Sequence, residues 1–247
     1  VDGHRYVDFL MGLGAVGLGH AWDAVNEAAF DAARRGGCPS LSTRLEADLA
    51  EALKRIIPCA DMSRFVKTGT EACMAAARVA RWATGRETVL VSGYHGWADW
   101  YAASKPRHEG VPADLERLTV SFPYNDLYVL EQLFVTFRRL RRPVAAVMME
   151  PCLYQMPAPD YLPEVRRLCT KEGALLIFDE VVTGFRWATG GAQEFFGITP
   201  DLATFGKAMA NGWPLAALVG KAEVMRHAEF CSSTFGAETP SLAAALR

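Results

Sequence analysis

The sequence lacks three features that would point to a membrane, a nucleic acid or a metal. No apolar run reaches about 18 residues, the length that a helix needs to span a bilayer. Neither sign of charge dominates: 26 Lys and Arg against 28 Asp and Glu give a net charge of −2, which predicts no nucleic-acid or membrane partner. None of the six cysteines forms C-x-x-C or stands beside a histidine at ligand spacing, so we expect no metal site.

The cysteines instead indicate a cellular compartment. They are scattered along the chain, at Cys38, Cys59, Cys73, Cys152, Cys169 and Cys231. Isolated thiols of this kind are typical of a reducing environment, so we expect a cytoplasmic protein.

A dinucleotide site is the first function that the sequence suggests. The stretch "FLMGLGAVGLGHAWDAV" contains G-x-G-x-x-G at Gly12, Gly14 and Gly17. A dinucleotide site also needs a strand before the glycines, and after the helix a second strand with an acid about 20 residues on. Here two helix-like segments follow one another, and the acid at that distance, Asp31, falls inside the first. A glycine-rich turn before a helix is therefore favoured over a nicotinamide or flavin site.

The rest of the chain alternates between strand-like and helix-like runs. Strands are expected at 64–69, 88–93, 144–151, 174–180, 201–207 and 214–220, and helices at 71–85, 126–141 and 161–173. The strands are apolar without alternation, which is typical of strands buried on both faces. This pattern predicts an α/β domain with a mainly parallel central sheet flanked by helices.

Ligands of such a sheet bind at the carboxyl ends of its strands, and three signals lie there. Gly69 and Thr70 stand at the start of a helix, where free N–H groups favour a phosphate, although Thr70 also suits an ordinary N-cap. Asp179 ends an apolar strand and fits a metal ligand, a helix cap or the partner of a buried cation. Lys207 follows an apolar strand and a glycine, so it is either a partly buried nucleophile or a lysine whose head reaches water.

Taken together, these signals describe one ligand. A phosphate-binding helix start, an aromatic side chain at Tyr94, a buried acid and a nucleophilic lysine are the groups that hold pyridoxal 5'-phosphate. We therefore predict this cofactor.

Several segments resemble a known family. They are "DGHRYVDFLMGLGAVGLGH", "TGTEACMAAARVAR", "SGYHGWADWY", "MMEP", "LLIFDEVVTGFR", "PDLATFGKAMANGWPLAALVG" and "SSTFGAETPSLAAA". They resemble the class III pyridoxal-phosphate-dependent aminotransferases, and among these the glutamate-1-semialdehyde 2,1-aminomutase-like branch. The resemblance implies the aspartate-aminotransferase-like large domain, fold type I of these enzymes, over residues 1–247. Because the chain starts at Val1 and ends at Arg247 inside a helix-like run, we expect an N-terminal segment and a C-terminal small domain to be missing.

The resemblance also implies roles for individual residues. Lys207 would form the aldimine with the cofactor and then carry the proton, and Asp179 would pair with the pyridinium nitrogen. Tyr94 and Val181 would cover the two faces of the ring, and Gly69 and Thr70 would hold the phosphate.

Three further residues complete the implied site. Glu150 lies where the family has an active-site glutamate near cofactor and substrate, and His95 shapes the turn after Tyr94. Thr234 resembles the threonine that reaches the phosphate of the neighbouring subunit, which implies a homodimer with shared active sites.

The implied function is transfer of an amino group between small amino and carbonyl substrates. Val182 stands where many family members have a glutamine, which favours the aminomutase-like branch. After Glu150 and Pro151, however, "CLYQMPAPDY" replaces the glycine–asparagine pair of aminomutases, although Gln155 is a candidate substitute for the asparagine. A true aminomutase is therefore the first alternative, and a truncated, non-catalytic family member is the second.

Overall fold

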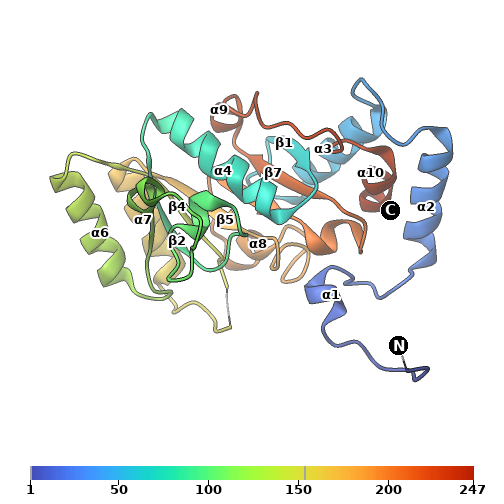
Figure 1. Ribbon diagram of the computed structural model, residues 1–247, viewed down its shortest axis with the longest axis horizontal. Helices are drawn as coiled ribbons and strands as arrows, with labels where there is room; N and C mark the ends of the chain where they lie inside the picture. Colours follow the sequence, from blue (N-terminus) through green and yellow to red (C-terminus); the bar gives the residue numbers. More distant parts are fainter. Residues whose placement is uncertain (1, 153) are drawn as a thin grey trace.

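The strands form one mixed sheet. The computed structural model describes residues 2–152 and 154–247, and over these residues it has a seven-stranded sheet of order β1-β7-β6-β5-β4-β2-β3 (Figure 1). The strands are β1 (Met62–Val66), β2 (Thr88–Ser92), β3 (Thr119–Ser121), β4 (Val144–Met149), β5 (Leu175–Asp179), β6 (Leu202–Phe205) and β7 (Ala216–Gly220). The neighbours from β3 to β6 are parallel, and β7 runs antiparallel between β6 and β1. The prediction of an α/β domain with a mainly parallel sheet is confirmed.

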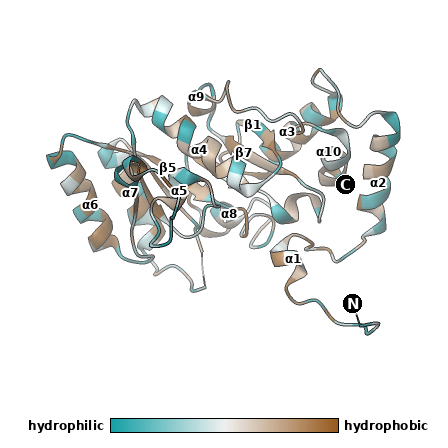
Figure 2. Ribbon diagram, viewed as in Figure 1, coloured by the Kyte–Doolittle hydropathy of each residue, from teal (hydrophilic) through white to brown (hydrophobic). Residues whose placement is uncertain are grey.

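The side chains of the strands alternate between two apolar cores. On β4, Ala146 and Met148 belong to one core, whereas Val147 and Met149 belong to the other. Because neighbouring residues of a strand point to opposite faces, both faces of the sheet are covered. This is why the strands are continuously apolar. In Figure 2, β5 and β7 are brown, whereas the outer helices α2 and α6 alternate between teal and brown.

Helices cover the two faces and the ends of the sheet. The α-helices are α1 (Met11–Gly14), α2 (Asp23–Arg35), α3 (Arg44–Ile56), α4 (Gly69–Thr84), α5 (Asp99–Ala102), α6 (Leu127–Arg139), α7 (Tyr161–Glu172), α8 (Ala192–Phe196), α9 (Ala222–Met225) and α10 (Thr239–Leu246). Short 3-10 helices span η1 (Ala113–Leu118) and η2 (Lys207–Ala210). Helix α4 packs on one face, while α6 and α7 belong to the core on the other face. None of the helices in the described chain is both long and apolar enough to cross a membrane.

The glycine-rich segment forms a turn, as predicted. Residues Gly12 and Leu13 have left-handed φ values of 60° and 58°, and helix α2 follows at Asp23. Between residues 2 and 61 no strand occurs, and Asp31 lies inside α2, so this part of the chain lacks the strands of a dinucleotide-binding unit. The side chain of Asn211 holds the segment in place by accepting from the N–H of Leu18 (3.0 Å) and donating to the carbonyl of Gly19 (3.1 Å).

Candidate active site

One cavity collects the candidate residues at the carboxyl ends of the strands. It has a volume of about 660 Å³, within the usual range for a small-molecule site. Eight of the predicted residues line it: Gly69, Thr70, Tyr94, His95, Glu150, Asp179, Val181 and Lys207. Asp179 is the last residue of β5, and the others lie in the segments that follow β1, β2, β4, β5 and β6. Five separate strand ends therefore converge on one site, as expected at the carboxyl ends of the strands of an α/β sheet.

The first turn of α4 presents free backbone N–H groups to this cavity. The N-cap is Thr68, whose hydroxyl accepts from the N–H of Glu71 (3.2 Å), while the Glu71 carboxylate accepts from the N–H of Thr68 (2.9 Å). The alternative that Thr70 caps the helix is therefore wrong. The N–H groups of Gly69 and Thr70 belong to the first turn, where a helix offers no internal acceptor, and the hydroxyl of Thr70 is not used for capping. Such a helix start favours an anion.

Glycines allow the loops around the cavity to approach one another closely. A Cβ atom at Gly69 would lie 2.9 Å from Cγ1 of Val181, and one at Gly93 would lie 2.7 Å from Oε1 of Glu150. A Cβ atom at Gly96, where φ is +95°, would lie 2.5 Å from Oγ1 of Thr70. The turn that carries Tyr94 and His95 therefore packs directly on the first turn of α4.

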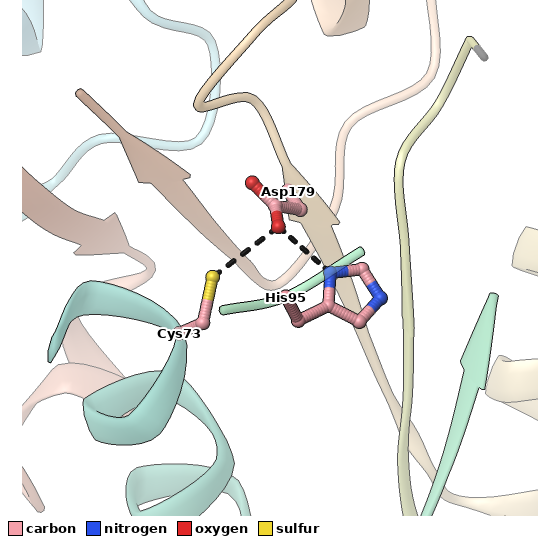
Figure 3. Close-up of side chains that lie close together, drawn as sticks. All are labelled: Cys73, His95 and Asp179. Atoms are coloured by element: carbon pink, nitrogen blue, oxygen red, sulfur yellow. Dashed lines mark hydrogen bonds and ion pairs between the residues drawn. The ribbon is translucent and has the colours of Figure 1, made fainter. Parts of the chain in front are cut away.

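Asp179 accepts a hydrogen bond on every side. Its Oδ1 accepts from the N–H of Val181 (3.1 Å) and from the hydroxyl of Thr204 (3.2 Å). Its Oδ2 lies 2.7 Å from Nδ1 of His95 and 3.3 Å from Sγ of Cys73 (Figure 3). Four donors hold this buried carboxylate, and four is the number that its lone pairs accept. The site therefore suits an ionised Asp179.

The group formed by Cys73, His95 and Asp179 also has the composition of a metal site. One ligand atom from each lies within 4.8 Å of the others. A zinc ion about 2.0–2.3 Å from each ligand would keep the ligand atoms roughly 3 Å or more apart. The 2.7 Å between Nδ1 of His95 and Oδ2 of Asp179 is instead a hydrogen-bond distance. Hydrogen bonding accounts for this cluster.

His95 was predicted only to shape the turn after Tyr94, but its side chain lies deep in the site, next to Asp179. Its side chain is buried, and its ring packs edge-on against Tyr101 at 5.2 Å. The second ring nitrogen, Nε2, is buried without a hydrogen-bond partner among the described residues. Since a carboxylate only accepts, Nδ1 carries the proton toward Asp179, and Nε2 is bare in the neutral ring.

Glu150 is fixed at the rim of the cavity. Its Oε1 accepts from the N–H of Tyr94 (2.8 Å), and its own N–H donates to the carbonyl of Ser92 (3.1 Å). Burial raises the pKa of the Glu150 carboxyl above its ordinary 4.5, although the N–H of Tyr94 opposes this shift. Tyr94 lines the same cavity and is 66% exposed, and its ring packs edge-on against Tyr101 at 5.9 Å.

Lys207 enters the cavity from a strained backbone. It has a φ of +45°, in the left-handed region that non-glycine residues rarely adopt. Strain of this kind concentrates at functional sites. Its side chain is partly buried, and it forms no hydrogen bond or ion pair with any residue of the described chain. The lysine therefore lines the same cavity as Asp179, as predicted for a partly buried nucleophile.

The acidic neighbour of Asp179 in the sequence has a structural role. Glu180, next to Asp179, points away from the cavity and is fully buried. It accepts from Thr183 and from the N–H groups of Ala192 and Gln193, at 2.7–2.9 Å, and burial raises the pKa of its carboxyl. It therefore anchors the loop after β5.

Thr234 is the one predicted site residue that does not line the cavity. It is exposed and lies in a turn closed by the N–H of Gly236 and the carbonyl of Ser233 (3.0 Å). A partly buried ion pair of 2.6 Å between Lys67 and Glu238 ties the end of this segment to the residue before the α4 N-cap.

Four residues around the site were not predicted from the sequence: Cys73, Thr204, Gly93 and Gly96. Two signals were present. Cys73 stands four residues after Gly69, so the two share a helix face. Thr204 is the register partner of Asp179 in the β5–β6 pair.

Comparison with known proteins agrees with this geometry. A family model described as class-III aminotransferase matches residues 1–247. The 3-aminobutyryl-CoA aminotransferase of Cloacimonas acidaminovorans (strain Evry) is 40% identical over 257 residues, covering 100% of this chain and 61% of that protein. The glutamate-1-semialdehyde 2,1-aminomutase of Sorangium cellulosum (strain So ce56) is 44% identical over 240 residues, covering 91% and 54%.

A solved structure extends the similarity to the fold. The FumI protein of Sphingopyxis sp. MTA144, in its PLP internal aldimine form, matches with a TM-score of 0.88 and 30% identity over 97% of this chain and 59% of that one. This match confirms the predicted type I fold. The chain spans between 54% and 61% of the length of these three relatives. The family model matches from the first residue to the last, and the chain belongs to the class-III aminotransferases.

Proposed function

We propose that this protein transfers amino groups between small amino and carbonyl compounds, with pyridoxal 5'-phosphate as cofactor. The observation that carries the proposal is the single cavity lined by both Lys207 and Asp179, with the open N-terminus of α4 in its wall. These are the groups that this cofactor requires: an amine for its aldehyde, an anion for its ring nitrogen and N–H donors for its phosphate.

The chain has a suitable residue for each part of the cofactor. Gly69 and Thr70 would hold the phosphate, because no hydrogen bond within the described chain uses their N–H groups or the Thr70 hydroxyl. Asp179 would face the ring nitrogen, and Tyr94 and Val181 would cover the faces of the ring. When bound, the cofactor supplies an electron sink that stabilises a carbanion next to the transferred nitrogen.

The protein's own contribution is to hold charges and to move a proton. Four donors satisfy the oxygens of Asp179, and His95 provides the shortest of these bonds. Lys207 has no hydrogen-bond or ion-pair partner among the described residues, so its amine would be available to hold the cofactor's aldehyde group and, as a free amine, would accept and return a proton. Glu150, held by the Tyr94 N–H, would face the substrate at the rim.

We also propose that residues 1–247 form the cofactor-binding large domain of a homodimer. An apolar groove of about 940 Å³ runs along α4, and its walls include the exposed side chains of Met74, Trp97 and Phe230. The turn that carries Thr234 follows Phe230 and lies outside the chain's own cavity. A second copy seated on the groove would cover these apolar groups and bring Thr234 to the partner's phosphate site.

The kind of amino-group transfer and the cellular compartment are further parts of the proposal. The relatives carry both transferase and mutase names, and Val182, which lines the cavity, favours an aminomutase as the second candidate. Conversion of glutamate-1-semialdehyde without an added amino acceptor would identify a mutase.

Free thiols at Cys38, Cys59 and Cys73 support a reducing compartment such as the cytoplasm.

The experiment is a titration of the purified full-length protein with pyridoxal 5'-phosphate. We expect saturable binding with a visible absorbance band in the unaltered protein. The Lys207→Ala variant should lose the band and all turnover. The control variant Lys171→Ala, altered on the far helix α7, should keep both. Full turnover and an unchanged band in Lys207→Ala would overturn the proposal.

A further inference from the structure

Cys73 occupies an unusual place beside the carboxylate of Asp179. Its thiol lies at the cavity wall, 3.3 Å from Oδ2, the same oxygen that His95 approaches at 2.7 Å from the other side (Figure 3). Burial, reinforced by the charge of Asp179, raises the pKa of the Cys73 thiol well above its ordinary value of 9.0. The sulfur therefore keeps its proton and serves as a donor.

The four hydrogen bonds leave Asp179 no lone pair for a further donor. A carboxylate accepts about four hydrogen bonds, and Val181, Thr204, His95 and Cys73 supply four. A ligand with a cationic N–H that enters the cavity must therefore replace one of them.

Cys73 is the donor that can be replaced most easily. The Val181 donor is a backbone N–H, Thr204 is fully buried on β6, and the His95 bond is the shortest of the four. The thiol makes the longest contact and is chemically the weakest donor. It also has a second acceptor in reach, because its Sγ lies 3.5 Å from the hydroxyl oxygen of Thr204. A rotation of the S–H bond exchanges one acceptor for the other.

From these contacts we infer that Cys73 is a positioning residue that satisfies Asp179 while the cofactor is absent and yields its place to the cofactor's ring nitrogen. The inference rests on the proposed function, since it needs a cofactor with a protonated ring nitrogen. The thiol then turns to Thr204. The cost of releasing a thiol from a carboxylate is smaller than the cost of releasing a hydroxyl or an imidazole, so a cysteine at this position stabilises the empty site without opposing the cofactor strongly.

The inference predicts opposite effects for two kinds of substitution. Cys73→Ala and Cys73→Val remove the competing donor, so the cofactor-free protein should unfold at a lower temperature while pyridoxal 5'-phosphate binds roughly three- to tenfold more tightly. Cys73→Ser supplies a stronger donor, so the cofactor should bind more weakly by a similar factor. Binding is measured as the dissociation constant in a Lys207→Ala background, where the covalent bond does not mask the contribution of Asp179.

Matched controls separate this effect from a general loss of packing. Cys169 is equally buried but lies on α7, away from Asp179, so Cys169→Val and Cys169→Ser should leave the dissociation constant unchanged. If the alanine, valine and serine variants of Cys73 all shift binding in one direction, or if none shifts it, the inference is wrong although the proposed function stands. If the protein with Cys73 and Lys207 intact does not bind pyridoxal 5'-phosphate, the proposed function fails and the inference with it.

Discussion

Gly96 sets the distance between the turn that carries Tyr94 and the first turn of α4. At this position an added Cβ would lie 2.5 Å from Oγ1 and 2.9 Å from Cα of Thr70. We expect Gly96→Ala to push the turn off the helix and to weaken binding of pyridoxal 5'-phosphate by roughly tenfold or more, since a misplacement of about 1 Å is costly in an active site. A dissociation constant from absorbance titration measures the effect.

Gly110 provides a control for the backbone strain in Gly96→Ala. Its φ of +87° is close to the +95° of Gly96, but a Cβ there meets nothing within 4 Å. Gly110→Ala therefore carries a similar conformational penalty without the steric one. Equal cofactor affinity in the two variants would show that contact with Thr70 does not hold the turn in place.

Glu150 makes the stability of the protein depend on pH with a predictable sign. Burial raises the pKa of its carboxyl above 4.5 in the folded chain, so between these two values the folded state binds more protons than the unfolded state. Its contribution to the free energy of unfolding is therefore lost as the pH rises from about 4.5 through the folded pKa. Relative to Glu150→Gln, which keeps the acceptor for the Tyr94 N–H, the unaltered protein should lose stability over this window.

Denaturant unfolding of the two proteins without cofactor, from pH 4 to pH 8, measures this difference. We expect the stability of the Gln variant relative to the unaltered protein to rise with pH and then level off. A difference that stays constant, or that falls as the pH rises, would contradict the raised pKa.

At the residue scale, the sequence was sufficient to predict the candidate site residues that stand at the end of a strand. Lys207 and Asp179 were recognisable because a charged residue at the end of an apolar strand, or just after it, lies at the carboxyl end of the strand, where ligands bind. The contact of His95 with Asp179 was not predictable, because it depends on how the turn after β2 folds back toward β5. Cys73 was also missed, since the depth at which α4 packs on the sheet is decided by tertiary contacts.

The capping box of Thr68 and Glu71 fixes the start of α4, which is the proposed phosphate-binding element. Replacing a threonine N-cap by alanine typically costs about 1 kcal/mol of stability. We expect Thr68→Ala to lower the free energy of unfolding by this amount and to weaken cofactor binding, because the first turn then frays. Thr199→Ala, at an exposed loop position, serves as the control and should change neither quantity. If Thr68→Ala and Thr199→Ala have equal stability and equal cofactor affinity, Thr68 does not fix the helix start.

At the element scale, the sequence pattern predicted the type of each helix or strand more accurately than its first and last residues. The strand expected at 64–69 ends at Val66, and the helix expected from residue 71 starts at Gly69. The difference of two residues changed which threonine caps the helix. Strand β3 is three residues long and too short for a pattern, and the antiparallel direction of β7 is not visible in a run that is buried on both faces.

The whole molecule exposes an apolar surface that a second copy would cover. Trp97 and Phe230, at 78% and 77% exposure, line the same groove along α4. We expect the unaltered protein to have the mass of a dimer in light scattering, and Trp97→Asp to shift it toward the monomer. Cofactor affinity should fall together with the dimer, because Thr234 would then no longer reach the partner's phosphate site.

Tyr128 offers a matched control for the oligomeric state. Its side chain is 71% exposed on α6, which lies at the end of the molecule opposite α2 and α10 (Figure 1). Tyr128→Asp should remain dimeric. A monomeric unaltered protein that binds the cofactor with full affinity would contradict the shared site.

The most direct measurement of the central claim is the identity of the residue that carries the cofactor. Borohydride reduction of the protein loaded with pyridoxal 5'-phosphate, followed by proteolysis and mass spectrometry, identifies the modified side chain. The account predicts a single phosphopyridoxyl group on Nζ of Lys207, and its loss in Asp179→Ala through weakened binding. A phosphopyridoxyl group on another lysine, or on none, in the protein with both residues intact would contradict it.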